Sequence, residues 1–448
     1  MNVHVMIDNS KTKQQSPCFK SKGIFFGRRD NIQKSKASYI RIVKWDLQGF
    51  IMSTLLIIFG TLLASIITIL SIYFIMPFPG SQHAETIDIA YALHGAYWYV
   101  LIPLLGFAIY GYVRLYLEHA SWLRKVVLVI PFLIIGIIMY MADRVMSADA
   151  MFLQPTSIEH VSVNDPSLDS SIIVIGTEIN GESIAYPLNV VGYHHQIRDS
   201  IGGVPVMITY CTVCRTGRIW DPVINGKNET FRLVGMDHFN AMFEDESTGS
   251  WWRQANGEAI TGKSKGTVLK EYPVFQKTLK EWKRRYPKSL VMLPDPGFKE
   301  EYAGLIGYDK GMVKSSLVGT QQQSWKDKAW VIGVKVGKTT KAYDWIATKA
   351  KRIILDKVDG EPILVSIQSD NATFNVWSRR VDSIVINPTS MGNDQLYDAG
   401  TQTLWDKTGR CIDGFLLGRR LTHIASYQEF WHSWRTFNPK TLTYGSPR

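Results

Sequence analysis

One stretch of the chain restricts its architecture more than any other. Residues 50–76, FIMSTLLIIFGTLLASIITILSIYFIM, run for 27 positions without a charged side chain. An α-helix crosses the hydrocarbon core of a bilayer in about 20 apolar residues. This run is therefore long enough to span a membrane with some tilt, and it is too long for the apolar core of a signal peptide.

Two further stretches in the first third have a similar character. Residues 92–112 are rich in Tyr and Trp, which favour the membrane–water interface. Residues 126–142 are shorter and contain Pro131, which membrane helices tolerate because neighbouring helices help to satisfy the freed backbone group. We predict three transmembrane α-helices in a membrane region at 49–147, with the lipid bilayer as a partner.

Lysine and arginine are unevenly distributed around these spans. Ten of them lie in the first 48 residues, whereas the loop PFPGSQHAETIDI between the first two spans holds none. Because positive residues remain on the cytoplasmic side, we expect a basic cytoplasmic tail at 1–48. Three crossings then place the carboxyl-terminal domain outside the cytoplasm. The basic tail is explained by orientation and contact with anionic lipid, and no nucleic-acid partner is expected.

The rest of the chain contains an internal repeat. Two long segments recur after an offset of 157 residues, and a later segment recurs at a slightly smaller offset. Such ordered matches at nearly constant spacing indicate a duplication. The matched pairs are 174–188 with 331–345, 197–209 with 354–366, and 275–290 with 427–442.

Each copy is predicted to be mainly β. Runs such as SIIVIGTEI are β-branched and end at Gly turns, and DSIGGVPVMIT is typical of a hairpin. Apolar spacing of three and four occurs only in VFQKTLKEWKRRY and its counterpart YQEFWHSWRTF, so each copy is expected to close with one helix. The predicted fold class is α+β, mainly β, with tandem duplicated β-rich units after the three transmembrane helices. Copy one is placed at 150–290, an irregular connection at 291–325, and copy two at 326–448.

The repeat separates shared positions from those found in one copy only. Gly, Pro, Trp and Asp recur in both copies and are expected to serve folding. Cys211 and Cys214, in VMITYCTVCRTGRIWD, face Gln368 and Asn371 in copy two. Any chemistry is therefore expected in copy one, with copy two as structural support.

Two cysteines at this spacing allow three interpretations. In the first they form a thiol–disulfide redox pair on the usually oxidising side of the membrane, with Arg215 stabilising a thiolate. No βαβ pattern surrounds them, so a thioredoxin fold is not expected. In the second they bind copper or zinc together with His195 and His238, since thiolate and imidazole ligands suit both metals. In the third they stiffen a loop of a non-catalytic envelope protein.

The paired histidines constrain the site further. His194 and His195 are read as part of a strand, on which neighbouring residues point to opposite faces. Only one of them then joins the cysteines, and we assign His195. The candidate catalytic residues are Cys211, Cys214, Arg215 and His195. The alternative metal ligands are Cys211, Cys214, His195 and His238.

These motifs carry a family resemblance. The segment AYPLNVVGYHHQIRDSIGGVPVMITYCTVCRTGRIWD, followed by FEDESTGSWWRQANGEAITG, resembles the bacterial family of unknown function DUF3179. Some members of that family are labelled selenoproteins, which implies reactive rather than passive chemistry at such a motif. This chain departs from the usual family pattern at Gln196, where Glu is common, and at Thr212-Val213, where Pro-Leu is common.

The sequence thus favours a membrane-anchored extracytoplasmic protein. Cys211 and Cys214 are expected to exchange disulfides with a redox partner protein, as in a thiol–disulfide oxidoreductase. A bound copper or zinc ion and a purely structural role remain the two alternatives. No other cofactor is expected.

Overall fold

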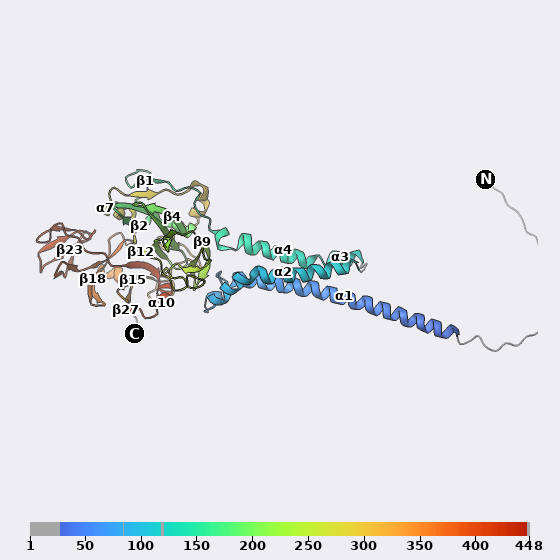
Figure 1. The fold of residues 1–448 in the computed structure, drawn as a ribbon. Helices are drawn as coiled ribbons and strands as arrows, with labels where there is room; N and C mark the ends of the chain where they lie inside the picture. The colour runs from blue at the N-terminus through green and yellow to red at the C-terminus, as the bar shows by residue number, and fades with distance from the viewer. Residues whose placement is uncertain (1–26, 84, 118–120, 446–448) are drawn as a thin grey trace, which may run out of the picture. The chain divides into compact units, whose positions relative to one another are not determined.

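The computed structural model describes most of the chain (Figure 1). Much of the basic tail predicted at 1–48 lies outside the described residues, and for 27–46 the backbone alone is described. The described residues are 27–83, 85–117 and 121–445.

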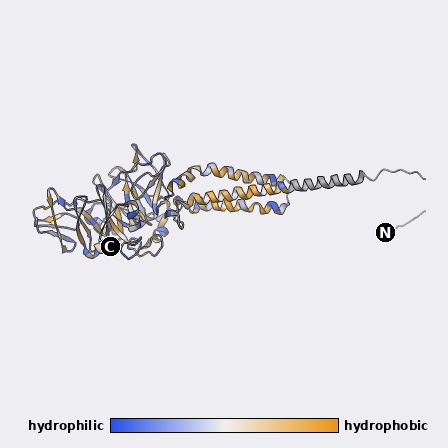
Figure 2. Ribbon diagram, turned by 90° about the horizontal axis from the view of Figure 1, so that it is seen from below, coloured by the Kyte–Doolittle hydropathy of each residue, from blue (hydrophilic) through white to orange (hydrophobic). Residues whose placement is uncertain are grey.

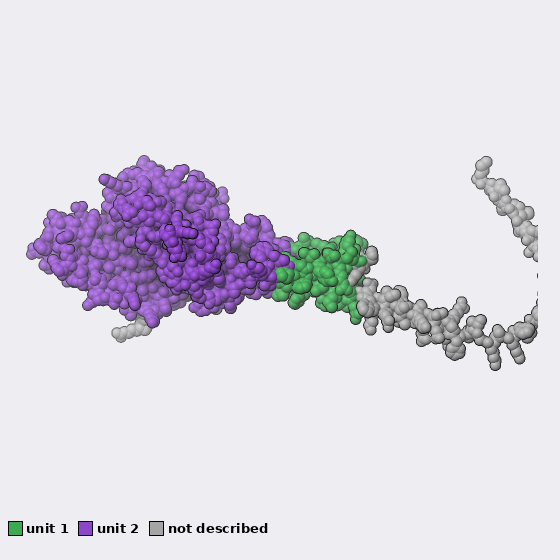
Figure 3. All heavy atoms as spheres, viewed as in Figure 1, with its two compact units in different colours: residues 1–63, 103–133 green, residues 64–102, 134–448 purple. Residues whose placement is uncertain are grey.

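The chain divides into two compact units (Figure 3). One contains the described residues up to 63 together with 103–133, and the other contains 64–102 with 134–448. The second unit contains the β-strands of the described residues and the helical residues 64–73, 87–102 and 134–145.

Three helical stretches are long and apolar enough to cross a membrane, as predicted: Leu47–Tyr73, Ile87–Leu117 and Trp122–Val145. Figure 2 shows these segments as predominantly hydrophobic. The first two belong to single helices, α1 (Gly27–Tyr73) and α2 (Ile87–Leu117). The third is built from α3 (Trp122–Val127), α4 (Ile130–Tyr140) and the π-helical turn η2 (Met141–Val145). It is interrupted just before Pro131, because proline suits the first turn of a helix better than its interior.

Glycines allow α1 and α2 to approach closely within the first unit. A Cβ atom at Gly60 would lie 2.6 Å from the carbonyl oxygen of Leu104, and one at Gly111 would lie 2.8 Å from that of Ser53. Small residues at such positions let membrane helices pack backbone to backbone.

The first half of the β-rich part, from β1 to β14, builds three larger sheets with strand orders β1-β14-β3-β2-β13, β12-β6-β5-β4 and β11-β10-β9, and one two-stranded sheet of β7 (Val223–Ile224) and β8 (Lys227–Asn228). The predicted strands and hairpin are present, with Gly202 and Gly203 at positive φ in the β4–β5 turn. The bounds are β1 (His160–Ser162), β2 (Ile173–Ile179), β3 (Glu182–Pro187), α6 (Leu188–His194), β4 (Gln196–Ile201), β5 (Val204–Cys211), β6 (Thr216–Trp220), β9 (Phe231–Asp237), β10 (Asn240–Asp245), β11 (Trp251–Arg253), β12 (Glu271–Tyr272), β13 (Phe275–Thr278), α7 (Leu279–Arg285) and β14 (Leu290–Met292).

The second half, from β15 to β27, repeats most of this order of elements and the register of its main strand pairs, but no strand of its sheets corresponds to β1 or β12. Ile175 pairs with Tyr186 across β2 and β3, and Ile332 pairs with Tyr343 at the positions 157 residues later. The parallel strand that completes each sheet, β14 or β27, also matches. The bounds are β15 (Trp330–Val336), β16 (Thr339–Asp344), α9 (Trp345–Lys351), β17 (Ile353–Val358), β18 (Glu361–Ile367), β19 (Phe374–Ser378), β26 (Ser426–Phe430), α10 (Trp431–Phe437) and β27 (Leu442–Tyr444).

The residues that recur in both halves make equivalent contacts. The Tyr186 hydroxyl donates to Asp199 Oδ2 at 2.7 Å, and Tyr343 donates to Asp356 at the same distance. Trp282 is fully buried against Gly176, where an added Cβ would lie 2.7 Å from the ring. A glycine is therefore required where the strand runs beneath the indole, and Trp434 and Gly333 repeat this arrangement.

The structure corrects two local predictions. His194 and His195 do not lie on a strand, because His194 ends the helix α6 (Leu188–His194) and His195 is its C-cap; α9 is the helix at the equivalent place in the second half. The closing helices are shorter than their periodic segments, because 275–278 and 426–430 are strands that pair with β2 and β15.

The two halves exchange polar contacts across their shared interface. Gln276 Nε2 donates to Gln428 Oε1 at 2.7 Å. Arg218 of the first half donates to Glu429 of the second at 2.5 Å, and both are buried. Lys277 of β13 in turn donates to Asn375 of β19 at 3.2 Å, so each half packs its β5–β6 or β18–β19 hairpin against the closing strand of the other. This exchange positions the candidate site.

Candidate functional site

The two cysteines lie at the mouth of a tight hairpin. Cys211 ends β5 and pairs with Thr216, the first residue of β6, so a four-residue loop carries Cys214. Arg215 closes this loop at φ 56°, in the left-handed region that residues with a Cβ rarely adopt. Both thiols are free and neither is exposed to solvent.

The two thiols differ in their environment. Burial by itself raises the pKa of Cys211, but hydrogen bonds from the Cys214 thiol and from the backbone N–H groups of Ala241, Cys214 and Val213 bring it below its ordinary value. Burial and the adjacent Cys211 sulfur raise the pKa of Cys214 well above its ordinary value. Cys211 is therefore the sulfur that ionises first, with Cys214 as its hydrogen-bond donor.

The second half of the molecule supplies polar groups to this hairpin. Lys328 Nζ donates to the Val213 carbonyl at 2.7 Å, and its charge favours ionisation of Cys214. The Ser433 hydroxyl hydrogen-bonds to Cys214. His432 Nε2 lies 3.2 Å from the Val213 carbonyl, and burial lowers the pKa of this histidine to about 4, so it is neutral near pH 7. The second half is thus part of the thiol environment and not only a support.

A second hairpin covers the sulfurs. The turn between β9 and β10 places His238 and Phe239 at φ 50° and 66°. A two-residue turn with both central residues at positive φ normally favours Asn and Gly, so a Phe here is unusual. The Phe239 carbonyl oxygen lies 3.4 Å from Cys211 Sγ and 3.2 Å from Cys214 Sγ.

The connection between α1 and α2 holds this covering turn in place. Gln82 is buried; its Oε1 accepts a hydrogen bond from the Phe239 N–H at 3.1 Å, and its Nε2 donates to the Phe74 carbonyl. The Ile75 carbonyl, just beyond α1, accepts from Met236 N at 2.7 Å. Ile75 also shares one hydrophobic cluster with both cysteines. The cover of the thiols is therefore anchored by residues that directly join two apolar helices.

Arg215 lies next to the cysteines in sequence but points elsewhere. Its guanidinium donates to Gln428 Oε1 at 2.8 Å and to the carbonyls of Tyr308 and Asp309, and it lies 3.8 Å from the centroid of the Trp330 ring. These contacts tie the hairpin to the second half and to the connection. The sequence analysis expected Arg215 to stabilise a thiolate; in the structure the positive charge that favours the thiolate of Cys214 is that of Lys328.

The two predicted histidines do not join the sulfurs. His195 follows α6 in a left-handed conformation, its Nδ1 donates to the Tyr193 carbonyl at 3.0 Å, and its ring centroid lies 4.3 Å from that of Phe152. Burial lowers its pKa to about 4. The His238 ring lies 2.7 Å from Asp237, whose hydrogen bond raises the pKa of the histidine. Among the described residues, no group of three or more His, Cys, Asp or Glu side chains is placed to hold a metal ion.

Sequence reasoning missed Lys328, His432 and Ser433 because they were sought in copy one. They could have been found by the same comparison of the two repeats, by looking for residues of the second repeat that differ from those at the equivalent positions of the first. His432 and Ser433 face Lys280 and Glu281 in copy one, so they are as specific to their copy as the cysteines are to theirs.

Comparison with known proteins gives one match. A family model described as a protein of unknown function (DUF3179) covers residues 153–441. Curated proteins and solved structures gave no match. The matched segment contains the cysteine hairpin, its cover and the residues contributed by the second half.

Proposed function

Since the chain belongs to the DUF3179 family, whose function is unknown, we propose that it is a membrane-anchored protein that exchanges thiols and disulfides through Cys211 and Cys214. The main support for this proposal is that the two thiols differ in pKa. The pKa of Cys211 is lowered and Cys211 accepts a hydrogen bond from the Cys214 thiol, whose own pKa is raised. An attacking thiolate and a resolving thiol need this asymmetry, because the thiolate is the nucleophile.

The proposed reaction proceeds in two displacements. The Cys211 thiolate attacks one sulfur of a partner disulfide, so a Cys211–partner bond forms and the other partner sulfur leaves as a thiolate. Cys214 then loses its proton, and the ammonium of Lys328 stabilises the thiolate formed. This thiolate attacks Cys211 Sγ, forms the internal disulfide and releases the second partner thiolate. The partner gains two electrons and two protons, and the cysteine pair loses them.

Access to the buried pair requires the covering turn to move. The Phe239 turn is held by the hydrogen bond to Gln82, and strained backbone at such a turn favours local opening. We infer that thiol exchange occurs from a minor open state in which this turn has separated from the hairpin.

Two further features belong to the same proposal. The basic amino-terminal tail and the uncharged first loop support an orientation with the soluble domain outside the cytoplasm. The matching registers support an origin of the two halves by duplication, with the thiols retained in one half and Lys328 and His432 in the other.

Trapping of a mixed disulfide tests the proposal. The Cys214→Ser variant, expressed in its native membrane, should accumulate a covalent adduct that reducing agent releases, because the resolving thiol is absent. The matched Cys211→Ser variant should accumulate much less. Equal adducts in both variants, or none in either, would contradict the assignment. Labelling of a cysteine introduced after residue 445 with an impermeant reagent in intact cells tests the orientation, and protection of that site would overturn it.

A further inference from the structure

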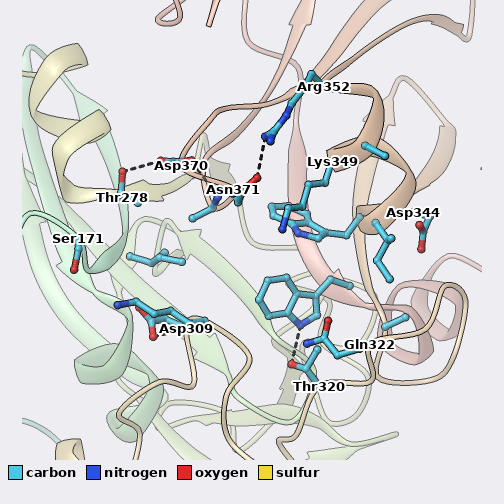
Figure 4. Close-up of a pocket in the computed structure, with 18 of the residues that line it drawn as sticks. Ser171, Thr278, Asp309, Thr320, Gln322, Asp344, Lys349, Arg352, Asp370 and Asn371 are labelled. Carbon is cyan, nitrogen blue, oxygen red and sulfur yellow. Dashed lines mark hydrogen bonds between the residues drawn. The ribbon is translucent and has the colours of Figure 1, made fainter. Parts of the chain in front are cut away.

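A large cleft lies on the side of α9 that faces the first half. Its volume is about 1110 Å³. Figure 4 shows Ser171 and Thr278 of the first half on one side and the helix α9 with two indole rings on the other. The indoles belong to Trp330 and Trp345, whose ring centroids are 5.6 Å apart. Ligands often bind in clefts where two parts of a fold meet, as the two halves of the β-rich part do here.

The equivalent surface in the first half is already occupied. There α6 stands where α9 stands in the second half, and a segment of the connection packs onto it: the turn Pro296–Phe298, the helix α8 (Lys299–Ala303) and the residues up to Tyr308. The Phe298 ring lies 5.4 Å from that of Tyr193, and the Tyr302 hydroxyl lies 2.7 Å from His194 Nε2.

The contrast is sharpest at one pair of positions. Gly192 on α6 is buried, and a Cβ there would lie 3.4 Å from a methyl group of Leu305. At the position 157 residues later, α9 carries the exposed Lys349, and the neighbouring Ile346 is 43% exposed. The second half thus presents the same helix face without the segment that covers it in the first half.

The charge of the cleft indicates what would cover it. Four cationic side chains line it, and none of them is in an ion pair between described residues: Lys280, Lys310, Lys349 and Arg352, the last of which donates hydrogen bonds to the Gln368 carbonyl and to Asn371. Of the three acidic residues in the lining, Asp370 is satisfied by hydrogen bonds from Thr373 and Thr278. Asp344 caps α9 through the Ala347 N–H, but its Oδ2 is buried without a partner in the described part of the chain.

We propose that this cleft binds an acidic polypeptide segment of a partner protein, laid along α9 as residues 296–308 lie along α6. The occupied half supplies the precedent for a short helical segment with aromatic side chains. Unpaired lysines on both walls supply the preference for acidic residues. This inference does not depend on thiol chemistry.

The probe for the test is a synthetic peptide with the sequence of residues 295–308, DPGFKEEYAGLIGY, which contains three acidic residues and one lysine. It is labelled with a fluorophore and titrated with the full chain in lipid nanodiscs, and anisotropy is recorded. We expect saturable binding that weakens about fivefold in Lys349→Glu and in Lys280→Glu, which alter opposite walls of the cleft. Lys357→Glu is the control, because it reverses the same charge at an exposed position of the second half that does not line the cleft.

Several results would overturn the proposal. These are absence of saturable binding, equal weakening by the Lys357→Glu control, and equal binding of a peptide in which the three acidic residues are replaced by lysine. A neutral oligosaccharide such as cellotetraose is tested in parallel by competition. Displacement of the peptide by the sugar would indicate a carbohydrate site instead.

Discussion

The hydrogen bond between the two thiols makes a quantitative prediction. Replacing Cys214 with Ala removes the side-chain donor that lowers the pKa of Cys211. A hydrogen bond to a charged group contributes about 1.5–3 kcal/mol, and one pKa unit corresponds to about 1.4 kcal/mol. Because the thiol is a weak donor, we take the lower end of that range and expect the pKa of Cys211 to rise by about one unit.

The sign follows from the charge that the bond stabilises. The donor interacts with the thiolate form of Cys211, so its loss disfavours ionisation and moves the midpoint to higher pH. Cys214→Ser retains a hydroxyl donor at the same place and should move the midpoint by less than Cys214→Ala does. Both variants keep the size of the side chain nearly unchanged.

Alkylation by iodoacetamide as a function of pH measures this midpoint. Mass spectrometry of the peptide that contains Cys211 separates its reaction from those of Cys18 and Cys411. Opening of the Phe239 turn multiplies the alkylation rate by the same factor at every pH, provided that the opening equilibrium does not depend on pH. The pH midpoint of Cys211 alkylation is then unaffected by the opening step. An unaltered midpoint in Cys214→Ala, or a larger shift in Cys214→Ser, would refute the reasoning.

Three other predictions follow from the same structure. Arg218→Ala should lower the free energy of unfolding by about 3–5 kcal/mol, because it leaves the buried Glu429 without its ion-pair partner. Arg419→Ala, which removes an exposed ion pair, should lower it by less than about 1 kcal/mol. Equal losses of the two variants in denaturant titrations would contradict this prediction. The raised pKa of His238 stabilises the fold fully below its ordinary value of 6.5, and this contribution is lost as pH rises through the folded pKa. His238→Gln should therefore flatten the fall in unfolding temperature above that pH, and an unchanged slope would argue against it. Gln82→Ala should speed alkylation of the cysteine pair about two- to tenfold by releasing the covering turn, with an unchanged rate as the opposing result.

Much of the architecture was predictable because it depends on local pattern. The length and apolarity of Leu47–Tyr73 are sufficient to predict a spanning helix. The recurrence of Tyr186 and Asp199 at an offset of 157 predicts a repeated contact, since identical pairs at identical spacing meet the same neighbours.

The short helices were missed for a physical reason. The segment LNVVGYH of α6 has seven residues, with two valines and a glycine, which are weak helix formers. Tertiary packing against Phe298 and Tyr302 supports it instead. Because His195 ends this helix rather than lying on a strand, the argument that placed it beside the cysteines did not apply.

The polar groups around the thiols could not be predicted from local sequence patterns. Lys328 and Ser433 reach Cys214 only because the two halves exchange contacts across their interface. No spacing along the chain encodes that exchange. The spacing of Cys211 and Cys214 did place them together, since a four-residue hairpin loop brings its ends into contact.

The central claim is that the two sulfurs form a reversible redox pair, and one measurement addresses it directly. The purified full chain in nanodiscs is equilibrated in a series of dithiothreitol or glutathione buffers of stated potential. The states of Cys211 and Cys214 are read by mass spectrometry, with metal content determined on the same sample. The account predicts that both thiols convert together to one internal disulfide and back at a single midpoint. Thiols that stay reduced throughout, or that a stoichiometric metal ion protects, would contradict it.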